Sequence, residues 1–537
     1  MQNTYDVVVV GYGFAGAAAA IAAADEGAKV LLVEKMPFPG GISITAGGGL
    51  RVCADEHAAF RYIQASNAGR TPDDNIRPIA AGMTWLPDWF TDIARTCGAT
   101  VTRKPYWGNY PFPGFDALEM LEVTHIPDFD PKAEFPHAKA LTGGTRSNRG
   151  GAQPSATGGG VGVFKVVAAA IESRPNIDVY LDCPVLELTR TAERVTGAIV
   201  RANGRDTHVA ATLGVILACG GFESSPELKR QYWQIDPVLS SACRGNTGDG
   251  LKMAQAVGAD LWHMWHFHGT YGFRHPNHPD VGIRMKRLPD WRPDAFGTQG
   301  DAHDRAARMA WVLLDQSGKR FMNEYAPYVQ DTGHRPMEPF DATKVGFTRI
   351  PSWLIFDEAA RQLYPVGAPV LNDSDPSVHY DWSDDNLKEL DNGLLGRADS
   401  IAELADAIGV ERNVLESTFA EWNETVSGER QDPHGRPPTS MVSLAEPPFY
   451  YGQIWPIVSN TQGGPRHDAH QRVLDPFGRP ITGLYVAGEL GSIWGHLYTS
   501  GCNLAECFVT GKIASTHACA NASTNASRIT TKPNVSP

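Results

Sequence analysis

Three glycines near the N-terminus have the spacing of a phosphate-binding turn. Gly11, Gly13 and Gly16 follow the apolar run Val7–Val10 and lead into an alanine-rich segment that favours a helix. In such a turn the first glycine allows the sharp bend, the second lets the backbone approach a pyrophosphate, and the third lets the helix pack on the strand. Because the N–H groups at a helix start attract phosphate, this stretch predicts the binding of a phosphorylated ligand.

The residues that follow supply the rest of a nucleotide site. A second apolar run, Val30–Val33, ends in Glu34, where an acidic side chain accepts hydrogen bonds from a ribose hydroxyl. A plain glycine turn between strand and helix is the alternative for the glycines alone. Strand, turn, helix, strand and acid all occur in order, however, and this favours a dinucleotide. A glycine-rich loop at 40–49, with Ser43 and Thr45 as hydrogen-bond donors, is expected to lie in close contact with the ligand.

Composition and charge narrow the class of protein. The chain has 537 residues, 42% of them hydrophobic and 20% charged, and a formal net charge of −13. This is an ordinary globular composition, and the acidic balance argues against nucleic acid or an anionic membrane as partner. No apolar run approaches the roughly 18 residues of a membrane span. The eight cysteines are scattered without metal-binding spacing, so we expect a reducing cytoplasm.

The pattern of elements changes twice along the chain. After the nucleotide motif we expect helical sequence to about Gly98, a loop from Tyr106 to Gly160, and then a helix and several strands, with a hairpin turn at Asn203-Gly204. From about residue 261 the sequence becomes rich in Pro, Trp and His. Near Tyr450 the first pattern returns, with a strand ending in Gly488-Glu489 and a final helix at 503–518.

These changes predict an α/β fold with a split Rossmann-type domain and an inserted α+β capping domain that binds substrate. The first part of the split domain covers 1–270 and the second 448–518, while the cap covers 271–447. The polar tail 519–537 is expected to be disordered.

Several segments together resemble one flavoprotein superfamily. PGGISITAGGG, ACGGFESSPEL, NTGDGLKMAQAVGA, GKRFMNE and the GLYVAGE…NLAEC…GKIA ending are similar to segments of the fumarate reductases and 3-ketosteroid dehydrogenases. The resemblance spans nearly the whole chain and implies FAD held by both ends of it. Members with covalent FAD carry a His in the loop that reads ISITAGGG here, so the resemblance implies non-covalent FAD. The residues expected to bind FAD are Gly11, Gly13, Phe14, Ala15, Gly16, Glu34, Lys35, Gly40, Gly41, Ser43, Thr45, Ala46, Gly47, Gly48, Val185, Gly220, Gly488, Glu489, Asn503 and Leu504.

Departures from the fumarate reductases indicate a different substrate. Those enzymes hold substrate carboxylates with a His and an Arg, at positions where this chain has Asn460 and Tyr498. Bidentate carboxylate binding needs the guanidinium fork. The proton-delivering Arg that follows their Asn-Glu pair is also missing here, since Tyr325–Tyr328 follows Glu324. We therefore do not expect succinate or fumarate as the substrate.

The same positions resemble the ketosteroid dehydrogenases. In that family, a Tyr before the last helix and a backbone N–H polarise a ketone oxygen, and a second Tyr takes the α-proton. Tyr498 matches the first Tyr and Tyr328 the second, while Cys502 replaces the last glycine of the family's Tyr-Pro-Gly-Ala-Gly segment. Tyr110 is a candidate to stabilise the phenolate of the base. The alternative for Tyr328 and Tyr498 is that both pack with satisfied hydroxyls.

The segment Leu261–Tyr271 contains three histidines that could be interpreted as metal ligands. On a strand, His266 and His268 share a face while His263 points away, and on a helix only His263 and His266 pair. We therefore predict no metal site, and expect these residues to line the substrate cavity or to pack at the domain junction. Asp249 and Asp331 are weaker catalytic candidates, and a turn-stabilising role explains Asp249 equally well.

The predicted activity is oxidation or reduction of a carbon–carbon bond next to a carbonyl, on a largely apolar, cyclic ketone or enone, with FAD. The electron acceptor is not identified. The alternatives are a fumarate-reductase-like reductase of an unsaturated acid and a flavin redox module without a small-molecule substrate. The loop that starts at Tyr106 carries the aromatic residues Tyr106, Trp107, Tyr110 and Phe112. Because this aromatic loop and the large insertion would serve a covered pocket, they favour an enzyme.

Overall fold

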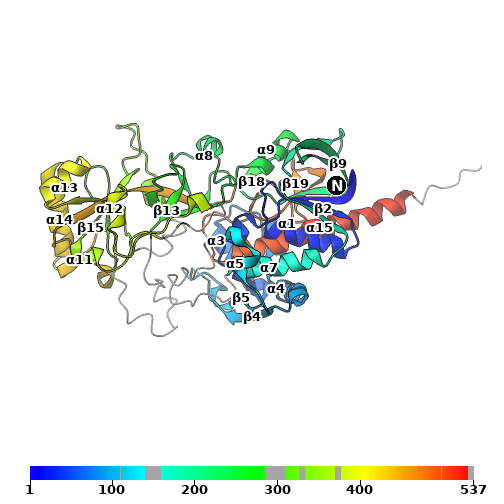
Figure 1. Ribbon diagram of the computed structural model, residues 1–537, viewed down its shortest axis with the longest axis horizontal. Coiled ribbons are helices and arrows are strands. Elements are labelled where there is room, and N and C mark those ends of the chain that lie inside the picture. The colour runs from blue at the N-terminus through cyan, green and yellow to red at the C-terminus, as the bar shows by residue number, and fades with distance from the viewer. Residues whose placement is uncertain are drawn as a thin grey trace, which may run out of the picture.

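The chain forms a mixed α/β structure with two large sheets toward opposite ends of an elongated molecule (Figure 1). The computed structural model describes residues 1–108, 110–138, 159–285, 309–325, 333–368, 370, 376–497 and 499–529. The first sheet contains the predicted nucleotide motif near the N-terminus. The second sheet contains most of the residues between 239 and 461 that form strands.

The first sheet joins the two ends of the chain. Its strand order is β19-β20-β9-β1-β2-β6, and β7 and β8 extend it beside β9. Five of its strands, from β20 to β6, run parallel, so the C-terminal β20 lies two strands from the N-terminal β1. The strands are β1 Thr4–Val10, β2 Val30–Val33, β6 Ile177–Tyr180, β7 Val185–Arg190, β8 Val195–Ala202, β9 Arg205–Leu217, β19 Arg472–Leu474 and β20 Pro480–Val486.

Alternating valines in β1 bury both faces of this sheet. Val7 and Val9 belong to the hydrophobic cluster formed with helices α1, α4, α7 and α15. Val8 and Val10 point to the other face and join the cluster that includes α8 and α9. A strand with apolar residues on both faces is typical of a parallel sheet covered on both sides. The helices are α1 Phe14–Asp25, α4 Asp73–Ala94, α7 Gly160–Glu172, α8 Pro226–Tyr232, α9 Asp249–Ala256 and α15 Cys502–Ile529.

The second sheet is built around one long central strand. β17 spans Phe449–Thr461 and pairs with β12 on one side and β15 on the other. The sheet has the order β13-β12-β17-β15-β14, with β10 and β16 also on β17. Its other strands are β10 Leu239–Ser240, β12 Phe267–Arg274, β13 Gly282–Arg284, β14 Val312–Leu314, β15 Ser352–Asp357 and β16 Gly396–Ala398. Helices α13 Ile401–Ile408 and α14 Arg412–Ser427 pack on this sheet and form their own hydrophobic cluster.

The predicted loop from Tyr106 to Gly160 is partly wrong. The strand β5, Leu118–His125, lies inside it and pairs with β3, Leu50–Cys53, and β4, Thr100–Pro105. Leu118, Met120, Leu121 and Val123 are buried without strict alternation, and the surrounding Pro and Gly residues suggested a loop. The shorter elements are β11 Leu261–Trp262, β18 Gly464–Pro465, α2 Gly41–Ile44, α3 Glu56–Asn67, α5 Pro131–Glu134, α11 Glu358–Arg361, α12 Lys388–Asp391, η1 Arg95–Cys97, η2 Phe115–Ala117, η3 Pro136–Ala138, η6 Arg335–Met337, η7 Pro376–Val378 and η8 Pro438–Ser440.

The predicted hairpin turn is present, whereas the predicted end of the final helix is wrong. Asn203 and Gly204 both have positive φ and connect β8 to β9, as the hairpin dipeptide predicts. The final helix is longer than expected, because α15 continues to Ile529, into the tail that we expected to be disordered. The alanines at 518 and 520, which favour helix, explain why the element does not end at residue 518.

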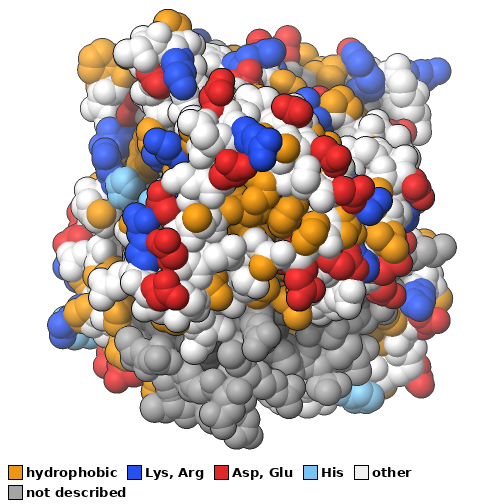
Figure 2. Space-filling view, turned by 90° about the vertical axis from the view of Figure 1, so that its left-hand side faces the viewer, with side chains coloured by type: hydrophobic (Ala, Val, Ile, Leu, Met, Phe, Trp, Pro, Cys, Tyr) orange, Lys and Arg blue, Asp and Glu red, His pale blue; other side chains and the backbone are white. Residues whose placement is uncertain are grey.

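The end of the molecule that carries α11 to α14 has a mixed surface. Figure 2 shows acidic and basic side chains interspersed around a central group of hydrophobic ones, with no continuous basic patch on the described part of this face. Among the described residues, no helix is both long and apolar enough to cross a membrane.

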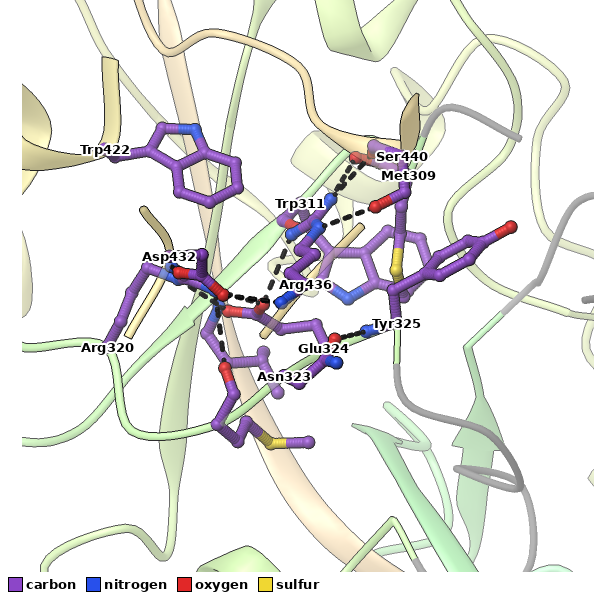
Figure 3. A network of polar contacts seen from close by, with 12 residues as sticks. Met309, Trp311, Arg320, Asn323, Glu324, Tyr325, Trp422, Asp432, Arg436 and Ser440 are labelled. Carbon is purple, nitrogen blue, oxygen red and sulfur yellow. Dashed lines mark hydrogen bonds and ion pairs between the residues drawn. The ribbon is translucent and has the colours of Figure 1, made fainter. Parts of the chain in front are cut away.

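A buried ion network holds part of the second sheet together (Figure 3). Glu324 accepts hydrogen bonds from Arg320, at 2.7 Å, and from Arg436, at 3.2 Å, and Arg320 also contacts Asp432. Arg436 donates further to the carbonyls of Met309 and Trp311. Both guanidinium groups lie over the ring of Trp422, so segments more than 100 residues apart are tied together.

Candidate active site

The glycine turn has the geometry that phosphate binding requires. Gly11 has φ +103°, and a Cβ at Gly16 would lie 1.8 Å from the carbonyl oxygen of Gly11, so no side chain fits at Gly16. Gly13 precedes the first residue of α1, Phe14, and carries no side chain that could block a ligand at the helix start. A negatively charged group can therefore approach the positive end of α1 at Gly13.

The glycine-rich loop folds back onto this turn. The N–H of Gly40 donates to the carbonyl of Tyr12 at 2.8 Å, and Ser43 Oγ accepts from the N–H of Phe14 at 3.1 Å. The predicted residues Gly41, Ala46 and Gly47 follow in the same loop, and Thr45 Oγ1 donates to the carbonyl of Ile42. Gly48, with φ +76°, lies so close to Gly159 that a Cβ would clash with its backbone. The structure thus brings the predicted loop residues to the helix start.

Glu34 lies beside the glycine turn but already has protein partners. Its two carboxylate oxygens accept from the N–H groups of Tyr12 and Met36, each at 2.9 Å. Burial raises the pKa of this carboxyl group, and those backbone bonds partly oppose the rise. Since each carboxylate oxygen accepts more than one bond, a ribose hydroxyl can still be received.

Two other residues predicted to bind FAD have different settings. Lys35 is bonded to Asp249, at 2.6 Å, and to Thr247, and is therefore tied to the start of α9. Val185 is the first residue of β7. It lies near Glu34, because Cys183, two residues before it, donates its N–H to the carbonyl of Glu34 at 2.8 Å.

Residues from the C-terminal part of the chain complete the cradle, which we define as the glycine turn, the loop at 40–49 and Gly488-Glu489. Gly488, with φ +75°, lies against Ala15, and its N–H donates to Thr510 Oγ1 at 2.9 Å. Glu489 accepts from the N–H of Thr461 at 2.9 Å, and burial followed by the charge of Glu223 raises its pKa. Residues near both chain ends therefore meet at one site, as the sequence predicts.

Several buried polar atoms around this cradle have no partner among the described residues. They are both amide atoms of Asn503, Nδ2 of Asn246 and Oγ1 of Thr461. Gly220 lies against Asn246, and Gly221 lies against Thr461 and Glu489. Buried polar atoms are almost always hydrogen-bonded, so the cradle fits a ligand rich in donors and acceptors. A flavin ring with its diphosphate has this chemistry.

The four catalytic candidates have different outcomes. Tyr328 and Tyr498 lie outside the described residues, as does Asp331. Tyr110 is buried, its ring stacks on Phe112 at 5.6 Å, and its N–H donates to Tyr62 Oη at 3.2 Å.

Cys502 begins α15, and its N–H donates to the carbonyl of Thr499 at 2.9 Å. That N–H is therefore engaged within the protein in this structure. Burial raises the pKa of its thiol to about 12, so the group stays neutral at pH 7 and is a poor nucleophile.

Arg51 is a residue that sequence reasoning missed. It is fully buried, and it donates to the carbonyls of Ser500, at 2.8 Å, and of Trp107, at 3.0 Å, and also to that of Tyr106. It thereby fastens the aromatic loop to the segment before α15. A charged residue inside the apolar strand Leu50–Cys53 was the available signal, since an arginine is rarely buried without a dedicated role.

The histidine segment is not one strand: β11 ends at Trp262 and β12 begins at Phe267, and in the turn between them the N–H of His266 donates to the carbonyl of His263 at 3.0 Å. The rings of His266 and His268 lie 4.9 Å apart, whereas His263 stacks on Trp262 and its Nδ1 lies 2.9 Å from the carbonyl of Ser492. In the described parts of the chain, no three His, Cys, Asp or Glu side chains are arranged to hold a metal ion.

A family comparison adds to this geometry. Residues 6–504 match the profile of a family described as FAD binding domain. The chain belongs to the FAD binding domain family. It binds FAD and is an FAD-dependent oxidoreductase, so the predicted cofactor is confirmed.

Individual relatives of this flavoprotein agree with the predicted resemblance. The 3-oxosteroid 1-dehydrogenase of Mycolicibacterium smegmatis is 27% identical, over 92% of this chain and 93% of that protein. The NADH:fumarate oxidoreductase of Klebsiella pneumoniae is 25% identical, over 95% of this chain but 47% of that protein. The fold is similar to that of 3-ketosteroid delta1-dehydrogenase from Sterolibacterium denitrificans, with a TM-score of 0.75 and 22% identity over 97% of this chain and 100% of that one. The predicted superfamily is confirmed.

We expect Gly13→Ala to weaken FAD binding by about 1–3 kcal/mol while the fold survives. The new Cβ would lie 3.1 Å from Ser43 Oγ, a side chain that can move, but it would occupy the approach of the pyrophosphate. FAD affinity of the apoprotein, measured by flavin fluorescence quenching, checks this. The control is Gly346→Ala, whose Cβ would meet only the carbonyl of Lys344 at 3.8 Å. Equal FAD affinities in the two variants would contradict the assignment.

Glu506 should make the protein less stable as the pH rises. Its carboxyl accepts from Ser492 Oγ and from the N–H of Ile493, both at 2.8 Å, and burial raises its pKa to about 8. Between its ordinary pKa of about 4.5 and pH 8, the folded protein keeps a proton that the unfolded chain releases, so stability falls through this window. Glu506→Gln should therefore gain thermal stability over the wild type from pH 5 to 8.5. The exposed Glu227→Gln is the control, and parallel pH profiles for wild type and Glu506→Gln would refute the prediction.

Proposed function

We propose that this flavoprotein dehydrogenates, or in reverse reduces, a carbon–carbon bond next to the carbonyl of a largely apolar, cyclic ketone. The observation that carries this proposal is similarity to a 3-oxosteroid 1-dehydrogenase over more than nine tenths of both chains. The positions of Tyr498 and Tyr328, which match the tyrosines of that family in sequence, support it. A 3-oxosteroid is the first substrate class to test.

The proposed chemistry divides the work between two tyrosines and the cofactor. Tyr498 donates a hydrogen bond to the ketone oxygen, and each such donor is worth roughly 3 kcal/mol as the enolate develops. Tyr328 accepts the α-proton at its phenol oxygen. A tyrosine with a pKa near 10 needs donors around its phenolate to act as a base at neutral pH, and Tyr110 is the proposed second phenol. Bound FAD would supply the two-electron acceptor for the hydride that leaves the β-carbon.

The arrangement of domains is part of the proposal. The first sheet with its helices forms the FAD-binding domain, and the second sheet forms the inserted cap. β10 and the first residues of β12, which lie within the 1–270 range expected for the FAD-binding domain, belong to the second sheet. Pairing of β17 with β12 and β15 favours a cap that ends near Thr461 rather than at 447. The loop at 40–49 contains no histidine, which supports non-covalent FAD. The active site is then the cleft between the two domains.

Anaerobic flavin spectra test the function directly. A saturated or monounsaturated 3-oxosteroid should bleach the bound FAD, and an enone should reoxidise the prereduced protein. Reoxidation by a simple unsaturated acid but never by an enone would favour the fumarate-reductase-like alternative instead. A flavin that responds to neither compound would favour a redox module without a small-molecule substrate.

A further inference from the structure

A cluster of one arginine and four histidines lies beside the candidate site and has no role in the chemistry above. We define this His-Arg cluster as His266, His268, His334, Arg335 and His496. They come from the segment between β11 and β12, from β12, from the η6 turn and from the loop before α15. The ring of His266 lies 4.9 Å from that of His268 and 6.1 Å from that of His496. Arg335 donates to the carbonyl of His496.

Arg335 brings a positive charge that the described residues do not neutralise. Its guanidinium group is partly buried, and burial lowers its pKa. In the described parts of the chain it forms no ion pair, and its hydrogen bond goes to a neutral carbonyl. Glu338 acts on it through space but is hydrogen-bonded to His334 Nδ1 at 2.7 Å. Because withdrawing a cation from water is costly without a counter-charge, Arg335 suits an anionic ligand.

The surrounding histidines are neutral rings rather than further cations. Burial, and next the charge of Arg335, lower the pKa of His268 to about 3 and also lower that of His496. Burial, the neighbouring His268 and Arg335 lower the pKa of His266. A neutral imidazole offers one N–H donor and one acceptor, so the cluster combines a single cation with neutral hydrogen-bonding groups.

Polar side-chain atoms in this region are buried without a hydrogen-bond partner among the described residues. His266 is 3% exposed and Gln462 is fully buried, yet His266 Nε2 and Gln462 Oε1 have no partner among the described residues. The amide of Gln462 faces His268, with 3.2 Å between its Nε2 and His268 Nδ1. Exchanging the oxygen and nitrogen of the Gln462 amide would place an N–H donor where Oε1 now lies without a partner. Unsatisfied buried groups of this kind indicate a missing polar ligand.

The cluster is connected to the candidate active site on two sides. Gln462 follows Thr461, whose N–H donates to Glu489 in the FAD cradle. On the other side, the charge of Arg335 interacts with the phenol of Tyr110. Toward solvent, Arg70 lies over the ring of Trp265, which is 42% exposed, and its Nε donates to His496 Nε2 at 3.3 Å. A ligand between these groups would have one end near the flavin and its other end in contact with Arg335.

We propose that the substrate carries, besides its ketone, a carboxylate that binds to Arg335 and to the N–H of His266. The proposal rests on the proposed function, because it assigns the second polar end of the same substrate. It differs from the unsaturated-acid alternative, since here the acid group lies away from the reacting bond. The substrate class is therefore a cyclic keto acid with an apolar body.

The test compares a 3-oxosteroid bearing a side-chain carboxylate with its methyl ester. Binding to the holoenzyme is measured by perturbation of the flavin spectrum, and kcat/KM with an artificial electron acceptor. The wild type should prefer the acid by roughly 10- to 100-fold, the range for a charge-assisted hydrogen bond. Arg335→Gln should bring the acid-to-ester ratio of affinities near one, through KM more than through kcat.

A matched control separates recognition from folding. Arg349 also donates to a backbone carbonyl of the same turn, that of Pro336 at 2.6 Å, so Arg349→Gln should keep the preference for the acid. If Arg335→Gln does not fold, Arg335→Lys is used in its place. This variant keeps the positive charge but not the guanidinium group, so it should lower the preference for the acid several-fold. The proposal would be overturned if the wild type did not prefer the acid, or if the Arg335 variant that folds kept the preference of the wild type. It would also be overturned if Arg349→Gln lost as much of the preference for the acid as the Arg335 variant. If acid-selective binding persists but neither steroid is oxidised, the proposed function fails and the carboxylate site stands.

Discussion

Replacing Tyr498 by Phe should lower kcat on a 3-oxosteroid by roughly 100- to 1000-fold and leave the FAD spectrum unchanged. The substitution removes one hydroxyl group, the proposed donor to the ketone oxygen, and loss of a single donor to a developing oxyanion has this cost. Retention of FAD is expected because the cradle is built from other residues, at the starts of α1 and α15 and in the loop at 40–49. Anaerobic single-turnover reduction of the flavin, followed by visible absorbance, measures the step directly.

The control for this experiment is Tyr451→Phe, which removes the same hydroxyl from a strand of the second sheet. It should leave both kcat and KM within about twofold of the wild type. A Tyr498→Phe variant with normal turnover would show that another group polarises the carbonyl. A variant that loses FAD would instead assign Tyr498 to cofactor binding. The ratio of effects on kcat and KM distinguishes a transition-state contact from uniform binding.

The cofactor site was predictable because local sequence determines it. The turn after β1 needs glycine at positions 11 and 16 for reasons of backbone conformation and steric contact, and the order of strand, turn and helix is visible in a single window of sequence. The same holds for the Asn203-Gly204 hairpin between β8 and β9. In each case, one or two residues impose a conformation that few others can adopt.

The substrate side was less predictable because its residues come from distant segments. Arg51 contacts carbonyls about 50 and 450 residues away, and neither partner is marked by side-chain type. Arg335 was missed for the same reason, since its neighbours His266 and His496 lie on other elements. The strand β5 was missed because the Pro and Gly residues around it suggested a loop. Such contacts depend on chain topology, and a periodicity argument does not contain that information.

Removing the charge of Glu324 should reduce the free energy of unfolding by about 3–5 kcal/mol, the usual cost of breaking a buried ion pair. In Glu324→Gln, Arg320 would keep its ion pair with Asp432, while the guanidinium group of Arg436 would lose its carboxylate partner and leave one buried positive charge without compensation (Figure 3). Burial acts to raise the pKa of Glu324, but the two guanidinium groups outweigh it and the pKa is lowered. The stabilisation is therefore present above the ordinary carboxyl pKa and is lost as the pH falls through the lowered one.

A second Arg–Glu pair of identical spacing provides the control. Arg412 and Glu416 form an i,i+4 pair on α14 at 2.8 Å, but their side chains are 68% and 46% exposed. Glu416→Gln should cost no more than about 0.5 kcal/mol, so the difference between the two variants measures the effect of burial. Chemical denaturation of the holoenzyme at pH 7, followed by tryptophan fluorescence, gives both values. Equal losses in the two variants would mean that Glu324 does not stabilise the second sheet through its charge. The same conclusion would follow if the difference in stability between the two variants did not become smaller below pH 4.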